Sequence, residues 1–181
     1  APDGEHVVAV GDRELIYTVA LREFACVAVT HTGHKRGTVQ APITATVEAP
    51  LVGMGSLILL AENDQSDSCR LRVFSMSEPQ KQIPQVAEAR VPGQVRDAPI
   101  LRGNQLYVPS SGERVSAFTV SDDPNKPPLT HLSTQALQTP HTGPMHLHAA
   151  PDAQVWLATS ALRRLENNAG TLAVVGDATA E

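Results

Sequence analysis

Residues 98–118 read APILRGNQLYVPSSGERVSAF, and their pattern is the clearest local signal in the chain. Two apolar segments, 106–108 and 115–120, flank the turn sequence SSGE, where Gly112 permits a backbone that other residues avoid. A third apolar segment follows Pro99, and residues before a proline favour extended backbone. The stretch therefore predicts short strands joined by tight turns.

The same pattern recurs along the chain every 49 residues. The recurring element is an apolar, β-favouring triplet followed by a turn and further apolar segments. The four triplets are Val8-Ala9-Val10, Leu57-Ile58-Leu59, Leu106-Tyr107-Val108 and Val155-Trp156-Leu157. With the segments around them, they predict four units of four strands each, spanning residues 7–36, 37–91, 92–137 and 138–176.

Four strands in each unit of 40 to 50 residues are typical of a β-propeller. Packed blades bury both faces of their inner strands, which explains continuous apolar runs such as 57–61. A β-sandwich would explain the density of strands but not the recurrence. We therefore predict an all-β fold, a β-propeller segment of about four four-stranded blades in an incomplete ring, with residues 1–181 forming a single segment.

The repeat also predicts which strand is missing. Residues 8–10 align with the second strands, so the first unit would lack its innermost strand and the chain would hold fifteen strands. Residues 161–168 fit either a third strand or a helical turn. The chain has neither an initiator Met nor a signal-peptide pattern at its start, so we expect a piece of a longer protein or a mature form. An open ring exposes apolar faces at its ends. The partners expected to cover them are the remaining blades of a parent chain, another protein subunit or a second copy in a homo-oligomer.

Composition excludes several classes of protein. Apolar residues make up 41% and charged residues 18% of the 181 residues, which is enough to build a core. The formal net charge of −5 argues against a basic, nucleic-acid-binding surface. The apolar runs are too short to span a membrane. Cys26 and Cys69 cannot form a disulfide framework, and sequence alone leaves open whether they pair with each other.

The order of segments in residues 98–118 resembles the PQQ-like, or quinoprotein-like, propeller repeat, in which an apolar strand, a Gly turn, Leu-Tyr-Val, a second Gly turn and Ala-Phe follow one another. The resemblance is close in the third unit and extends to the second and fourth. It implies a large bacterial protein with a propeller and no obvious enzyme chemistry. An extracytoplasmic bacterial location is favoured, although the sequence does not establish the compartment.

The chain departs from the enzymes of that family at the residues that carry their chemistry. Those enzymes use adjacent half-cystines, a stacking tryptophan and a carboxylate–Ca²⁺ site. In this chain Cys26 and Cys69 are far apart, and Trp156 is the only tryptophan. The resemblance therefore implies the fold rather than the dehydrogenase activity, and no cofactor is predicted.

Histidines are the most suggestive candidates for a site. Four of the seven lie within 18 residues, and we consider them candidate metal or haem ligands: His131, His141, His146 and His148. The simpler interpretation is that they are polar loop and channel-wall residues, because no carboxylate or cysteine stands at ligand spacing. The oxygen-rich stretch 62–68 could bind Ca²⁺, but it lacks the order of a calcium loop and is better explained as a solvated turn.

These observations favour a non-catalytic β-propeller scaffold or binding module, part of a larger bacterial protein or assembly. Two alternatives remain at this point. One is a fragment of a quinoprotein-type oxidoreductase whose site lies partly outside the chain. The other is a propeller that binds a metal or haem through the histidine cluster.

Overall fold

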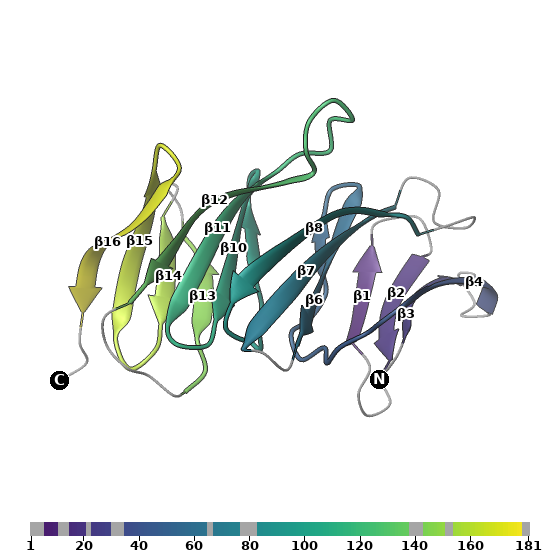
Figure 1. Ribbon diagram of the computed structural model, residues 1–181, viewed down its shortest axis with the longest axis horizontal. Coiled ribbons are helices and arrows are strands. Elements are labelled where there is room, and N and C mark those ends of the chain that lie inside the picture. The colour runs from purple at the N-terminus through teal and green to yellow at the C-terminus, as the bar shows by residue number, and fades with distance from the viewer. Residues whose placement is uncertain are drawn as a thin grey trace.

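The computed structural model describes residues 6–10, 15–20, 23–29, 35–64, 67–76, 83–137, 143–150 and 154–178. Within these ranges the chain contains no helix, and sixteen strands form four antiparallel sheets of four strands each. The sheets stand side by side in a row, and the described strands do not close into a barrel (Figure 1). The all-β fold, a propeller segment of four four-stranded blades, is thereby confirmed.

Each sheet is an up-and-down meander in chain order. The first sheet contains β1 (His6–Val10), β2 (Leu15–Ala20), β3 (Glu23–Val29) and β4 (Lys35–Pro42). The second contains β5 (Val52–Met54), β6 (Leu57–Asn63), β7 (Ser68–Ser75) and β8 (Gln85–Pro92). The third contains β9 (Ile100–Arg102), β10 (Gln105–Ser110), β11 (Arg114–Val120) and β12 (Leu129–Ala136). The fourth contains β13 (His146–Ala149), β14 (Val155–Ala158), β15 (Leu162–Asn168) and β16 (Thr171–Ala178).

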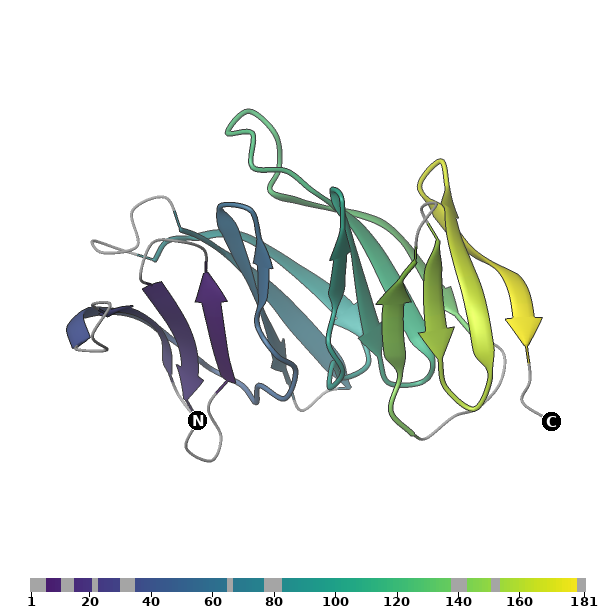
Figure 2. The ribbon, with the colours of Figure 1, turned by 180° about the vertical axis from the view of Figure 1, so that it is seen from behind.

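The hydrophobic core lies in layers between neighbouring sheets. Alternate residues of β6 point to opposite faces, so Ile58 and Leu60 pack toward the first sheet while Leu57 and Leu59 pack toward the third. Every residue of β6 is buried, as expected for a strand covered on both faces. The first strands of the sheets lie next to one another in the order β1, β5, β9, β13, and the fourth strands β8, β12 and β16 lie next to one another along the other edge of the row (Figure 2).

Tyr107 and Phe118 in the third unit are both buried between blades. Their exposed fractions are 1% and 0%. They lie on the paired strands β10 and β11 but point in opposite directions. Phe118 packs in the layer shared with the second sheet, and Tyr107 packs in the layer shared with the fourth.

The prediction that the first unit lacks its innermost strand is wrong. Val8-Ala9-Val10 belong to β1, the first strand of a complete four-stranded sheet, rather than to a second strand. Residues 37–42, which were assigned to the start of the second unit, form most of β4 and pair with β3. The first sheet therefore extends past the expected boundary at residues 36 and 37, and the described residues hold sixteen strands instead of fifteen.

The uniform period of 49 residues also needs a correction at the second sheet. The hairpin pairs Met54↔Leu57 and Arg102↔Gln105 are equivalent, which sets the spacing between these sheets at 48 residues. Leu57 and Leu106 are therefore not equivalent, and they pack against each other's sheets in the same core layer. A shift of one residue moves a strand's side chains to the opposite face. The triplets 57–59 and 106–108 are therefore similar in composition, but their side chains point to opposite faces of their sheets.

The structure also tests the expectations for residues 161–168 and for a membrane-spanning segment. Residues 162–168 form strand β15, so the helical alternative for this stretch is excluded. Among the described residues, none forms a helix of the length and apolar character needed to cross a membrane.

Candidate functional site

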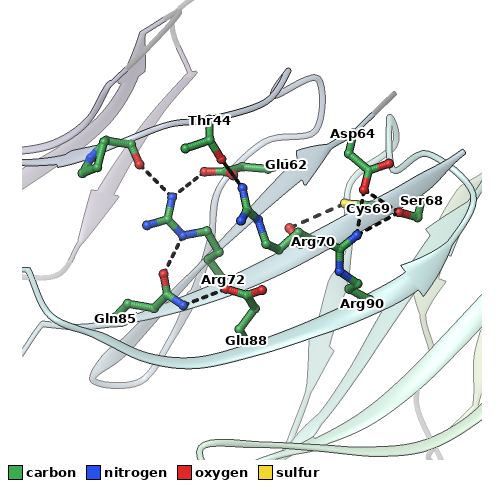
Figure 3. A network of polar contacts seen from close by, with 11 residues as sticks. Thr44, Glu62, Asp64, Ser68, Cys69, Arg70, Arg72, Gln85, Glu88 and Arg90 are labelled. Atoms are coloured by element: carbon green, nitrogen blue, oxygen red, sulfur yellow. Dashed lines mark hydrogen bonds and ion pairs between the residues drawn. The ribbon is translucent and has the colours of Figure 1, made fainter. Parts of the chain in front are cut away.

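A buried ionic network at one end of the second sheet is the densest polar feature of the described residues (Figure 3). The Glu62 side chain is fully buried, and its two carboxylate oxygens bind different guanidinium groups. The Arg70 Nη2 atom lies 2.7 Å from the Glu62 Oε2 atom, and the Arg72 Nη1 atom lies 2.5 Å from the Glu62 Oε1 atom. The Thr44 hydroxyl also donates to Oε2 at 3.1 Å and accepts a hydrogen bond from Arg70. The carboxylate is therefore satisfied from three directions, as a buried charge requires.

The strand register brings these groups together. Glu62 on β6 stands directly opposite Arg70 on β7, and Arg72 stands opposite Leu60. All lie on the face that also carries Phe74, whose ring centroid is 4.8 Å from the Arg72 guanidinium carbon. The network thus continues the apolar layer between the first and second sheets toward the end of the strands.

Arg72 uses its remaining donors to connect neighbouring elements. One donor reaches the backbone carbonyl of Pro42, the last residue of β4, at 2.7 Å. Another reaches the Gln85 side-chain oxygen at 2.6 Å, and Gln85 in turn donates to Glu88 at 3.0 Å. Arg72 therefore ties the first sheet to both the third and the fourth strand of the second sheet.

Asn63, next along β6, holds the connecting segments on either side of the second sheet. Its backbone pairs with Thr46 in the segment between β4 and β5. Its side chain donates to the Val95 carbonyl at 2.9 Å and accepts from the Val95 N–H at 2.8 Å, in the segment between β8 and β9. The amide also donates to Glu48 at 3.0 Å. One side chain thus fixes both connections.

The oxygen-rich stretch considered for Ca²⁺ is occupied by protein groups where it is described. Glu62 binds the two arginines, and Asp64 forms an ion pair with Arg90 at 2.7 Å and accepts from Ser68 at 2.7 Å. Residues 65 and 66 lie outside the described residues. Glu62 and Asn63 are buried at the end of strand β6, so the prediction of a solvated turn is wrong at these two residues.

Cys69 lies beside this network and is a free, buried cysteine. Burial raises the pKa of its thiol to about 12, and the carboxylates Asp64 and Glu62 contribute in the same direction. Since the thiolate is the reactive form, this thiol is inert at neutral pH. It packs as an apolar residue in the layer toward the third sheet.

The structure separates the candidate histidines. His131 is exposed on β12 in the third sheet, where it stacks edge-on against Phe118 and lies 3.0 Å from the Thr134 hydroxyl. His146 and His148 are exposed on β13 in the fourth sheet. His141 lies outside the described residues. No group of three or more His, Cys, Asp or Glu among the residues that the structure describes could hold a metal ion, and a metal or haem role for this cluster stays a prediction.

The interface between the third and fourth sheets has its own buried polar contacts. Glu113, in the β10–β11 turn, lies 3.9 Å from Arg163 on β15, and both side chains are buried. The backbone N–H of Met145 donates to Asp97 at 2.9 Å. These contacts parallel the network at the second sheet, because they also join separate sheets and their connecting segments.

Sequence reasoning missed Arg70, Arg72 and Thr44 as members of a network. One signal was available: Arg70 and Arg72 alternate within an otherwise apolar central strand, where an unpaired charge would be costly. The identity of their carboxylate partner depends on the pairing of β6 with β7, which the sequence does not specify.

Comparison with known proteins supports the fold alone. No family model matches the chain, and no curated protein matches its sequence. A crystal structure of a protein from Lactobacillus plantarum is 11% identical with a TM-score of 0.60 and covers 97% of this chain and 52% of its own. The computationally designed protein Ika8 is 10% identical with a TM-score of 0.65, covering 94% of this chain and 47% of its own. The chain thus spans about half the length of these two structures.

Proposed function

We propose that this chain is a non-catalytic β-propeller scaffold or binding module, and that it belongs to a larger bacterial protein or assembly. The observation that carries the proposal is where its buried charges lie. Glu62 with Arg72, and Glu113 with Arg163, each join one sheet to a neighbouring sheet or connecting segment. Buried ion pairs add little net stability, but they favour one arrangement of the groups they join. A surface for binding other macromolecules needs such a fixed arrangement of blades.

The outer strands and one loop offer the surface for such binding. Strand β12 is exposed or half-buried along its whole length, and β8 is so except at Val91. The loop formed by residues 121–128 stands out from the row of sheets in both views (Figures 1 and 2). Asn125 is exposed in this loop, which is internally ordered by a hydrogen bond from Lys126 to the Asp123 carbonyl. Protruding loops on a rigid scaffold are common sites of recognition.

The test compares binding with catalysis. A photoreactive amino acid placed at Asn125 should give a discrete adduct in the parent organism, and the purified partner should bind the chain saturably in calorimetry. A photoreactive residue at buried Phe118 is the control and should give no adduct. In parallel, the chain is titrated with PQQ and Ca²⁺. A saturable quinone absorption band with dye-linked dehydrogenase turnover would contradict the proposal and favour an oxidoreductase fragment.

A further inference from the structure

We draw no further inference here: the strongest candidate, the outer edge of strand β12, where Leu129–Ala136 contain no Lys, Arg, Asp, Glu or Pro and pair only with β11 among the described strands, carries no proposal because nothing in the structure shows what covers it.

Discussion

Among single residues, Glu62 has the most demanding environment, because its fully buried carboxylate lies between two guanidinium groups. Glu62→Gln keeps the size of the side chain and removes the charge, which leaves Arg70 and Arg72 without their counter-ion. We expect a loss of about 3–5 kcal/mol in the free energy of unfolding, measured by urea denaturation. Glu88→Gln, the same change at an exposed residue of the same network, should alter it by less than about 0.5 kcal/mol. Equal effects would show that the buried pair is not organised as described.

The raised pKa of Cys69 predicts that the stability of the fold depends on pH. Its native pKa of about 12 lies above the ordinary value of 9.0, so the unfolded state loses this proton first as the pH rises. The contribution of Cys69 to stability should be complete below pH 9 and decline between pH 9 and 12. The free energy of unfolding is compared between this protein and its Cys69→Ala variant, both carrying Cys26→Ser. The difference isolates the pH dependence due to Cys69 from that of the other titrating groups. In the same background the folded protein should not react with a thiol reagent at pH 8 and should react fully in urea.

Among the segments that connect the strands, Gly93 is the glycine that a larger side chain could replace least easily. It follows β8 with a φ of 80°, and a Cβ there would lie 2.5 Å from the Ser111 carbonyl oxygen in the β10–β11 turn. Gly103, in the β9–β10 turn, has a φ of 56° and open space around it. Gly103→Ala should cost about 1–2 kcal/mol for the backbone conformation alone. Gly93→Ala should cost about 1–3 kcal/mol more because of the collision, and thermal unfolding of both variants would test the order.

The packing of one blade on the next depends on residues such as Phe118, which belongs to β11 and fills the layer between the second and third sheets. Phe118→Ala should destabilise the chain by about 3–5 kcal/mol through lost burial and a residual cavity. Phe118→Leu keeps most of the volume and should cost clearly less. If chemical denaturation found both variants near neutral, the assignment of β11 to a doubly covered blade would be contradicted.

At the scale of the whole molecule, the described residues cover the second and third sheets on both faces and the fourth sheet on one. Stability in repeat folds is set by contacts between neighbours. Backbone amides of β6, β7, β10 and β11 should therefore exchange with deuterium more slowly than those of β14 and β15. Mass spectrometry measures this exchange. Equal protection in all four sheets would indicate one cooperative unit instead.

Much of the fold could be predicted because blade strands carry their signal locally. The run 57–61 is apolar without interruption, which is typical of a strand covered on both faces, and all of its residues are buried in the structure. The pattern Leu106-Tyr107-Val108 after a Gly turn identified one strand of a hairpin. The candidate site could not be predicted from the sequence in the same way, because the network around Glu62 joins β6, β7 and the segment after β4. No local pattern specifies which carboxylate two arginines will meet.

The amino-acid sequence by itself determined the all-β class, the four-stranded unit and its repetition, because turn residues and apolar runs act over a few neighbouring positions. Only the tertiary structure decided the spacing of 48 residues between the second and third sheets, the completeness of the first sheet and the separation of His131 from His146 and His148. The physical reason is that strand register is chosen by the packing of whole faces. A connecting loop can absorb one residue without cost, whereas a strand displaced by one residue turns every side chain to the opposite face.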